Sequence, residues 1–471
     1  MASRIGFLGI CLGYFAVILD GSVLNVGIPD IRQDLGASMA GVQWTVNGYT
    51  LALAALLLSG GTLGERFGLK RTLLVGLGVF TLASAWCSAA QSSTVLIVAR
   101  VVQGLGAAAL LPATLALIPH IFPERAVRER AAVVWVATSA IAVSVGPLVG
   151  GLLIDQFGWR SIFLINIPVC TASAAVVWRH VGETPRHRVP VDYPGQVLAV
   201  VALGLVTGGI IAAGSQGWAS PATWGLIVAG AVACAAFLRT ERRSTHPLLP
   251  LSFFAHKVRS AAVVALGATG FLFYGVLFVM SLYFQQALGW SSGRTGVALL
   301  PLTVGTVVAP LALYGPLARR FGHPLMMITG FSGFVLGTGE LLWGGGGAAY
   351  AWIAVGLLVL GVASTFVPSA AASIVVSTVT AGQGGLASGV QNTLRQTGGL
   401  LSVAVFGSLL NSSDFMGRLR VVLAVMAVCS VLGVLGAVSV RRTARAAGAP
   451  RDPGGPPTDP LPLAGRVADE S

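Results

Sequence analysis

The chain has 471 residues, of which 55% are hydrophobic and 10% are charged, and its mean hydropathy is +0.83. Soluble domains typically carry roughly 25% charged residues, so this chain has too little polar surface to cover a water-soluble globule. The composition excludes a soluble protein and predicts an all-α polytopic membrane protein.

The net charge is +13, which on its own would fit a nucleic-acid-binding protein. We count about fourteen apolar segments, each close to the ~20 residues that one membrane crossing needs. With the N-terminus placed in the cytosol, most Lys and Arg residues fall in inner loops and in the C-terminal tail. Because this bias satisfies the positive-inside rule, we expect a multi-pass protein of the cell (cytoplasmic) membrane with cytosolic termini and no nucleic-acid partner. The predicted segments are 5–27, 43–61, 72–90, 94–118, 131–153, 161–178, 195–214, 222–238, 261–284, 295–317, 325–343, 349–376, 386–410 and 421–440.

The first segment contains an acidic residue, Asp20, within the run from Leu19 to Pro29. A carboxylate at that depth is costly unless it faces a water-filled cavity, meets a partner or binds a proton. We therefore take Asp20 as the first candidate for the group that binds and releases protons. The alternative interpretation is a fixed structural hydrogen-bond acceptor.

A tight inner turn at 61–71 ends the second segment. Its glycines permit close backbone approach, and one carboxylate lies beside three cations. We interpret these charges as bridges between helix ends that stabilise one state of a carrier rather than as substrate contacts. The residues assigned to this conformational motif are Gly61, Glu65, Arg66, Gly68 and Arg71.

In the fourth segment, Arg100, Gln103 and Gly104 lie three and four residues apart, so they share one helix face. That face is polar at its outer end and small beyond it, which suits a helix packed tightly beside a cavity. Arg100 would favour the anionic form of Asp20, and we expect substrate and proton to compete for the Asp20 region. A brace between helix ends is the alternative role for Arg100.

The fifth segment carries Gly146 and Gly150 at four-residue spacing, with Pro147 and Gly151 beside them. Pro147 removes a helical hydrogen bond and should bend the helix. The small residues let a neighbouring helix approach closely. The pattern predicts a hinge or a seal, with ordinary close packing as the alternative.

Residues 315–322 repeat residues 61–68, with identity at five of eight positions. The copies lie eight predicted helices apart, whereas two adjoining six-helix halves would place them six apart. We therefore predict two six-helix halves with a two-helix insert, and internal duplication of this kind is common in secondary transporters. The predicted parts are an N-terminal half at 1–180, the insert with basic cytosolic loops at 181–259, a C-terminal half at 260–440 and a disordered cytosolic tail at 441–471.

A polar stripe with a buried cation in the segment 386–410 marks a candidate cavity wall. Aromatic and amide side chains of other segments are further candidates, although such positions usually belong to the core or face lipid. A large apolar cavity with few polar anchors suits amphiphilic compounds better than sugars. The candidate substrate-cavity residues are Tyr49, Trp135, Tyr274, Gln285, Gln391, Asn392 and Arg395.

Glu340, near the outer end of the segment 325–343, is the other acid flanked by apolar residues. We assign it as a second candidate for proton coupling, because an ionisable group within a membrane segment is often functional. The alternative is an ordinary residue of the outer interface.

Together these segments resemble the major facilitator superfamily and, within it, the fourteen-helix drug:proton antiporter family of bacteria, over about residues 5–440. The resemblance implies the major facilitator fold. Its Gly-Pro-x-x-Gly-Gly element is associated with exporters, and this association sets the expected direction of transport. The motifs that carry the resemblance are Leu19-Asp20…Asn25…Pro29, the 61–71 turn, Arg100-x-x-Gln103-Gly104, Gly146-Pro147-x-x-Gly150-Gly151 and Trp159-Arg160…Asn166-x-Pro168.

The chain departs from the family pattern at several positions. Glu65 stands where Asp is usual and should keep the charge interaction, whereas Leu69 replaces a usual cation, so part of that network is missing. Ala142 replaces the first glycine of the Gly-Pro-x-x-Gly-Gly motif, which is a mild change. Arg319 replaces the acid in the second copy of the turn, so we expect any charge relay there to be degenerate.

The energy source follows from what the sequence lacks. A P-loop needs Gly-Lys followed by Ser or Thr, and neither Lys70 nor Lys257, the two lysines of the chain, has this context. The remaining candidate energy source is an ion gradient. Moving one elementary charge across the membrane provides about 2.3 kcal/mol per 100 mV of membrane potential. The five cysteines are single and show no metal-ligand spacing, so we expect no metal and no cofactor.

We predict a monomeric carrier, not an enzyme, that exports small amphiphilic compounds such as antibiotics in exchange for protons by alternating access. Its partners would be the substrate, protons and the lipid bilayer. A lipid or metabolite carrier on the same scaffold is the main alternative. A polytopic membrane enzyme is less favoured, because it would need a cluster of acids, His or Cys at one membrane face, and the sequence shows none.

Overall fold

The computed structural model describes residues 2–186, 190, 192–344, 349–379, 384–412 and 414–446. Within these ranges the chain forms helices and turns without a strand, and thirteen helical runs are long and apolar enough to cross a membrane. The fourteenth predicted segment, 386–410, is also helical and forms α16 (Gly384–Leu410), whose polar stripe lowers its mean hydropathy. The predicted all-helical membrane fold is confirmed.

The helices follow the predicted segments in order. The first part of the chain forms α1 (Ala2–Asp34), α2 (Met39–Phe67), α3 (Leu69–Ser88), α4 (Ser93–Ile121), α5 (Arg125–Phe157), α6 (Ser161–Leu164) and α7 (Asn166–His180). Two long helices follow, α8 (Tyr193–Gln216) and α9 (Pro221–Arg243). The last part forms the 3-10 turn η1 (Leu251–Phe254), α10 (Lys257–Leu282), the π-helical turn η2 (Tyr283–Ala287), α11 (Ser292–Ala298), α12 (Leu300–Val308), the π-helical turn η3 (Ala309–Tyr314), α13 (Gly315–Phe321), α14 (His323–Gly344), α15 (Tyr350–Thr378), α16 and α17 (Phe415–Ala446).

The predicted tail begins at position 441, but helix α17 continues beyond that position and ends at Ala446. The remainder of the predicted tail, 447–471, lies outside the described residues.

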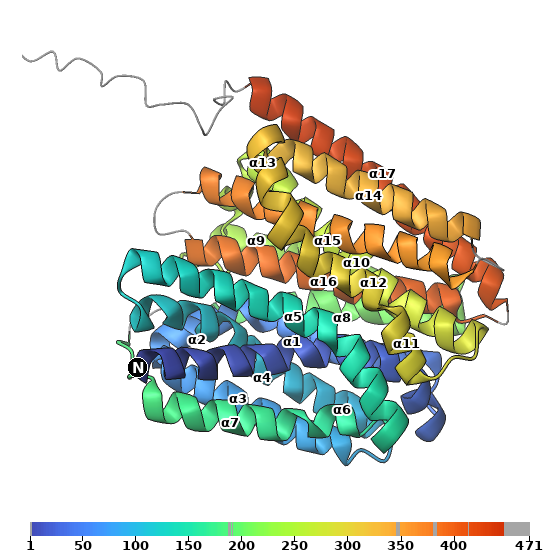
Figure 1. The fold of residues 1–471 in the computed structure, drawn as a ribbon, viewed down its shortest axis with the longest axis horizontal. Coiled ribbons are helices and arrows are strands. Elements are labelled where there is room, and N and C mark those ends of the chain that lie inside the picture. The colour runs from blue at the N-terminus through green and yellow to red at the C-terminus, as the bar shows by residue number, and fades with distance from the viewer. Residues whose placement is uncertain are drawn as a thin grey trace, which may run out of the picture.

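Consecutive long helices run antiparallel, so the turns alternate between the two ends of the bundle (Figure 1). We call one end the basic end: it carries the start of α1 and the turns at 66–71, 120–128, 239–259 and 319–323. The opposite end carries the turns at 35–38, 89–92, 158–160 and 217–220. The start of α1 and the end of α17 both lie at the basic end.

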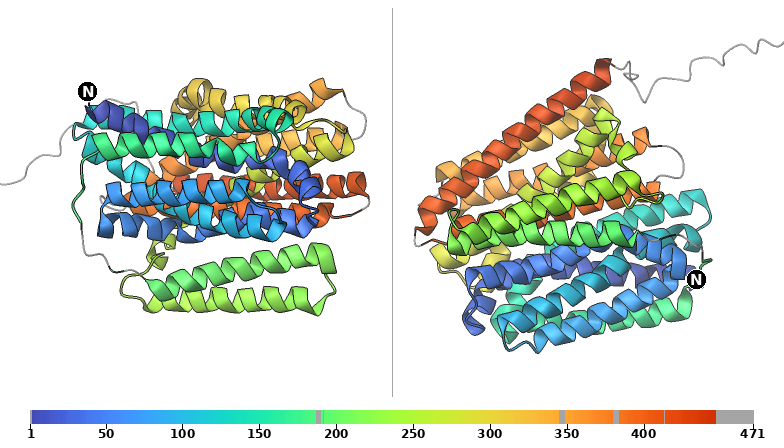
Figure 2. Two further views of the ribbon diagram at one scale, coloured as in Figure 1. Left: turned by 90° about the horizontal axis from the view of Figure 1, so that it is seen from below. Right: turned by 180° about the vertical axis from the view of Figure 1, so that it is seen from behind.

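Helices α1–α7 form one side of the bundle and helices α10–α17 form the other (Figure 1). Between the two sides, α1 packs against α10, α2 against α16, and α5 against α11 and α12. Helices α8 and α9 form an antiparallel hairpin on the outside of this bundle, as both views in Figure 2 show.

The α8–α9 hairpin is hydrogen-bonded to both sides. Toward the basic end, Gln196 Nε2 of α8 donates to the carbonyl oxygen of Ala55 in α2 at 2.7 Å. Toward the opposite end, Ser408 Oγ of α16 donates to the carbonyl oxygen of Ile210 in α8 at 2.7 Å. The hairpin therefore connects α2 of the first half to α16 of the second.

The sequence repeat corresponds to a repeated backbone turn. Gly68 separates α2 from α3 with φ +96, and Gly322 separates α13 from α14 with φ +80. Backbone conformations with positive φ favour glycine because it has no Cβ. The two glycines occupy the same position in the segments 61–68 and 315–322. In both halves, this shared glycine therefore lies between the end of one helix and the start of the next.

Candidate functional site

A buried ion pair joins α1 to α4. Arg100 Nη1 donates to Asp20 Oδ2 at 2.6 Å, and the two side chains are 1% and 2% exposed. The same guanidinium bonds Gln103 Oε1 at 2.6 Å and, through Nε, the carbonyl oxygen of Thr45 at 3.3 Å. The structure therefore brings together Asp20, Arg100 and Gln103.

Two amides complete the surroundings of the Asp20 carboxylate. Gln103 Nε2 donates to Oδ1 at 3.0 Å, and Asn166 Nδ2 of α7 donates to the same oxygen at 2.8 Å. Ser84 Oγ of α3 accepts from Gln103 Nε2 at 2.8 Å. These bonds offset the cost of burying the charge. We assigned no role to Asn166 or Ser84 from the sequence. Asn166 belongs to the Trp159-Arg160…Asn166-x-Pro168 motif that carries the family resemblance, whereas Ser84 is only a polar residue in an apolar run.

Tyr49, a candidate cavity residue, lies against this ion pair. The Arg100 guanidinium carbon lies 4.2 Å from the centroid of the Tyr49 ring. Gly104 lets α4 approach α2 closely, since a Cβ there would lie 2.5 Å from the Tyr49 carbonyl oxygen. Stacking on the cation and close helix packing bury Tyr49, and the structure places it outside the wall of the cavity described next.

A cavity of about 1160 Å³ lies between the two sides of the bundle. Drug-sized ligands typically occupy pockets of ~300–1,000 Å³, so the space accommodates one. The ends of α2, α4 and α5 and the segments that flank the α8–α9 hairpin surround its mouth, so the cavity opens at the basic end. Charged and titratable residues at the mouth are Glu65, His120, Arg128, Asp192 and His246.

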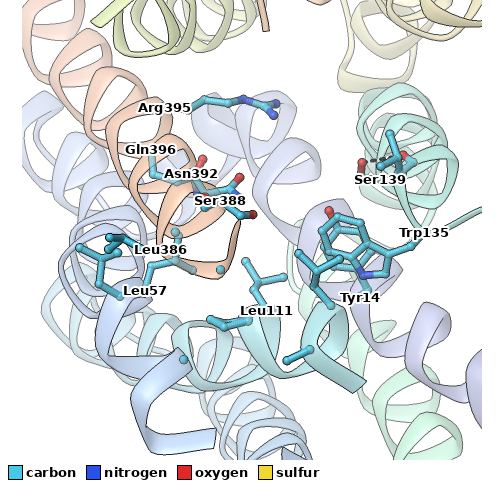
Figure 3. Close-up of a pocket in the computed structure, with 18 of the residues that line it drawn as sticks. Tyr14, Leu57, Leu111, Trp135, Ser139, Leu386, Ser388, Asn392, Arg395 and Gln396 are labelled. Atoms are coloured by element: carbon cyan, nitrogen blue, oxygen red, sulfur yellow. Dashed lines mark hydrogen bonds between the residues drawn. The ribbon is translucent and has the colours of Figure 1, made fainter. Parts of the chain in front are cut away.

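The inner part of the cavity has an aromatic wall and a polar wall (Figure 3). Tyr14 of α1 and Trp135 of α5 stack with their ring centroids 4.1 Å apart and an interplanar angle of 11°. Facing them, α16 presents Asn392 and Arg395, and Tyr274 of α10 also lines the space. Four of the candidate cavity residues therefore do line the cavity, and Tyr14 joins them although the sequence did not single it out.

Asp20 does not belong to the cavity wall. Tyr14 and Ile18 line the cavity and lie four residues apart, so they share one face of α1. Asp20 follows Ile18 by two positions and therefore points to the other face, toward α4 and α7. A substrate in this cavity would therefore not occupy the same space as a proton on Asp20, which differs from the expected competition for the Asp20 region.

The two sides are closed together at the opposite end. Gln285 Nε2 donates to the carbonyl oxygen of Val26 at 2.9 Å, and Ser292 Oγ donates to Asp30 Oδ2 at 2.6 Å. Gln285, a candidate cavity residue, therefore belongs to this closure. Gln391, another candidate, is partly buried on α16 and lies outside the cavity wall.

The glycines of α5 contribute to the same closure. A Cβ on Gly150 would lie 2.8 Å from a side-chain carbon of α1, and a Cβ on Gly151 would lie 2.9 Å from a Cα of α11. Gly146 also faces α1, and Pro147 faces α11 through its carbonyl oxygen. The motif thus allows α5 to contact the first helix of one side and a helix of the other side at once.

At the basic end, the charges of the 61–71 turn are apart from one another. Arg71 Nε lies 3.6 Å from Glu183 Oε2, and the Arg66 guanidinium lies over the neighbouring Phe67 ring. Glu65 makes no ion pair with any described residue and is exposed beside Gly61 at the cavity mouth. Among the described residues, Glu65 therefore bridges no helix ends in this conformation, whereas Arg71 at the start of α3 reaches Glu183, which follows α7.

Glu340 lies on α14, away from the cavity. Its Oε1 is buried and has no hydrogen-bond partner in the described part of the chain. A Cβ on Gly356 of α15 would lie 3.0 Å from Glu340 Oε2, so the carboxyl group sits between two helices of the second half. Across the described ranges, no three His, Cys, Asp or Glu side chains are grouped so that they could hold a metal ion.

Comparison with known proteins agrees with this architecture. Residues 10–403 match the family described as Major Facilitator Superfamily. The chain is 34% identical over 402 residues to the multidrug resistance protein Stp of Mycobacterium tuberculosis, covering 85% of this chain and 74% of that protein. It is 35% identical over 415 residues to the tetracenomycin C resistance and export protein of Streptomyces glaucescens, covering 86% and 75%. The fold is similar to the crystal structure of the POT family transporter PepTSo, with a TM-score of 0.65 at 17% identity over 94% of this chain and 98% of that one. This chain belongs to the Major Facilitator Superfamily.

Proposed function

We propose that this protein exports small amphiphilic compounds, antibiotics among them, in exchange for protons by alternating access. The observation that carries the proposal is the cavity of about 1160 Å³, which is open at one end of the bundle and closed by direct helix contacts at the other. A compound reaches such a cavity from one side of the membrane only, as a carrier requires. The names of two relatives, which refer to multidrug resistance and to tetracenomycin C export, favour antibiotics as cargo.

The basic end faces the cytosol in this proposal, because basic loops remain on the inner side of a membrane. Both termini are then cytosolic, and the conformation described here is open to the cytosol, which is the state in which an exporter loads its cargo. One chain encloses the whole cavity, in keeping with a monomeric carrier.

Asp20 is the group that we propose to carry the proton. Removing one charge of a buried ion pair leaves the other uncompensated, which costs about 3–5 kcal/mol. Protonation of Asp20 would leave the Arg100 guanidinium buried without a counter-charge. Protonation therefore favours a conformation in which water or another group reaches Arg100. The proton is thereby linked to a change in helix packing.

Helix α1 connects this event to the cargo. It carries Asp20 on one face and the cavity residues Tyr14 and Ile18 on the other. A rotation or shift of α1 that separates Asp20 from Arg100 would also move part of the cavity wall. Substrate and proton would then act on one helix from opposite faces, rather than compete for one site.

The conformational motifs fit the two closures that alternating access needs. Gly146, Pro147, Gly150 and Gly151 make the close contacts of the opposite end, and we propose that they seal the outer side. We propose that the 61–71 turn seals the basic end when the halves close there. Glu340 remains a proposed second protonatable group, because one of its carboxyl oxygens is buried and has no hydrogen-bond partner among the described residues.

Inside-out membrane vesicles that contain the protein test this function. With tetracenomycin C as the probe, an acidic vesicle lumen should drive accumulation by the wild type, and Asp20→Asn should reduce it to the level of vesicles without the protein. Glu124→Gln, which removes an exposed carboxylate at the start of α5 that makes no side-chain cap hydrogen bond and no ion pair with a described residue, is the control and should accumulate the probe normally.

Two results would contradict the proposal in different ways. Equal accumulation by the wild type and Asp20→Asn would remove Asp20 from proton coupling. Accumulation that ignores the pH gradient, for tetracenomycin C and for a wider panel of aromatic antibiotics, would contradict proton-coupled export itself.

A further inference from the structure

Among the described residues that line the inner part of the cavity, one side chain, that of Arg395, carries a fixed charge, and this charge is positive. Among the described residues that line the cavity, the acidic ones are Glu65 and Asp192, which lie at the mouth near the end of α2 and the start of α8. Arg395 lies in the middle of α16, about 16 Å from the start of that helix at about 1.5 Å per residue. Deep in the cavity, its guanidinium therefore faces no carboxylate of the wall.

Arg395 also lacks the partners that Arg100 has. No described carboxylate lies within ion-pair distance of Arg395, and its side chain donates no hydrogen bond to a described residue. Its closest aromatic neighbour is Tyr274, with the guanidinium carbon 5.8 Å from the ring centroid. A cation within a membrane protein normally pairs with an acid or a carbonyl group unless it faces a water-filled pathway for substrate. The unpaired guanidinium is therefore available to a group that enters the cavity.

Across the cavity stands a flat aromatic surface. Trp135 stacks on Tyr14, and its indole Nε1 donates to Thr114 Oγ1 at 3.2 Å, which holds the ring in place. Figure 3 shows Arg395 and Asn392 on the α16 wall and the stacked pair on the α1 and α5 wall. A planar molecule in this space can therefore meet an aromatic face and a cation at the same time.

We propose that the cavity selects aromatic compounds that carry a carboxylate or an ionised phenol, and that it disfavours lipophilic cations. The anionic oxygens pair with the Arg395 guanidinium, whose planar fork matches a carboxylate in two parallel hydrogen bonds. The ring system packs against Trp135 and Tyr14. This inference rests on the proposed transport function for its physiological meaning, but it concerns binding alone.

Three probes with one ring system and different charges test the selection: 9-anthracenecarboxylate, 9-anthracenemethanol and 9-(aminomethyl)anthracene. Binding to the purified full-length protein in lipid nanodiscs is followed by the fluorescence of the anthracene at neutral pH. We expect the carboxylate to bind about tenfold or more tightly than the protonated amine, with the alcohol between them, as a direct ion pair would give.

Variants separate the charge from the ring surface. Arg395→Gln should weaken the carboxylate about tenfold or more, leave the alcohol nearly unchanged and improve the amine, whereas Arg395→Lys should retain part of the preference. Trp135→Leu should weaken all three probes to a similar extent. Arg418→Gln, which removes an exposed cation at the opposite end, is the control for net charge and should match the wild type.

The inference is overturned if the carboxylate and the amine bind equally, if Arg395→Gln weakens all three probes alike, or if none of the probes binds. Comparing the thermal midpoints of the variants excludes misfolding as the cause of a loss of binding. Arg395→Lys, which keeps the positive charge, provides a second test of the preference for the carboxylate. Because no gradient is applied, this result is independent of the vesicle experiment, so failure of selection and failure of proton-coupled export are told apart.

Discussion

At the scale of single residues, the two arginines of the membrane interior stand in contrasting surroundings. Arg100 is held by Asp20, Gln103 and a backbone carbonyl, whereas Arg395 faces open space. The sequence predicted both as unusual, because a charge inside an apolar segment stands out. It linked Arg100 to the anionic form of Asp20 but left a brace between helix ends open as the alternative, since direct pairing depends on how α1 and α4 pack. Tyr14 escaped prediction because a tyrosine in an apolar helix resembles a core residue until its cavity-facing side is known.

The pairing of Asp20 with Arg100 predicts non-additive stability. Arg100→Gln leaves the Asp20 carboxylate buried without a counter-charge and should lower stability by about 3–5 kcal/mol. The double variant Asp20→Asn with Arg100→Gln removes both charges and should recover much of this loss. The thermal midpoint in detergent, followed by intrinsic tryptophan fluorescence, measures the effect. A double variant that is less stable than either single variant would show that the two charges do not act as a pair.

At the scale of elements, the glycine-rich face of α5 was predictable and its partners were not. The four-residue spacing of small residues predicted close helix contact, and the structure shows that contact with α1 and α11 at once. Which helices meet α5 depends on the arrangement of the two halves, which no local pattern encodes. The bridge expected from Glu65 likewise depends on whether the basic end is open or closed.

A larger residue on this face should open the outer seal. In the present conformation, the side chain of Gly151→Leu would overlap the backbone of α11, so we expect the seal to loosen without loss of the fold. A cysteine introduced at Ser292, in a background where the five native cysteines are replaced by alanine, should then react faster with an impermeant maleimide added from the outer side. Gly225→Leu on α9, where a Cβ meets no neighbour within 4 Å, is the control. Unchanged labelling in Gly151→Leu would argue that this glycine does not hold the seal.

For the whole molecule, the sequence predicted the internal repeat and the two added helices, because the matching turns lie eight predicted helices apart instead of the six that two adjoining halves would give. It did not predict where these two helices lie relative to the bundle. Helix α8 contacts the bundle through scattered residues such as Gln196 and backbone carbonyls, which carry no periodic signal. The cavity, its open end and its closed end likewise emerge only when both halves are assembled.

The two proposals together predict a dependence on membrane potential. Export of a monoanion against import of one proton moves two elementary charges, whereas export of a neutral compound moves one, and each is worth about 2.3 kcal/mol per 100 mV. Collapse of the potential with valinomycin and potassium, at constant pH gradient, should therefore slow export of 9-anthracenecarboxylate more than that of 9-anthracenemethanol. Equal slowing of the two compounds would exclude export of the carboxylate as an anion.

The hydrogen bonds of the α8–α9 hairpin have a mechanical consequence. One bond ties the hairpin to α2 near one membrane surface, and another ties it to α16 near the other surface. Because the hairpin is hydrogen-bonded to both halves, it cannot move as a rigid body with one half alone. In the alternating access that we propose, the halves rock against each other, and the hairpin must then tilt or release one of these hydrogen bonds. We therefore expect its two attachment points to influence the rate at which the carrier changes between its two open states.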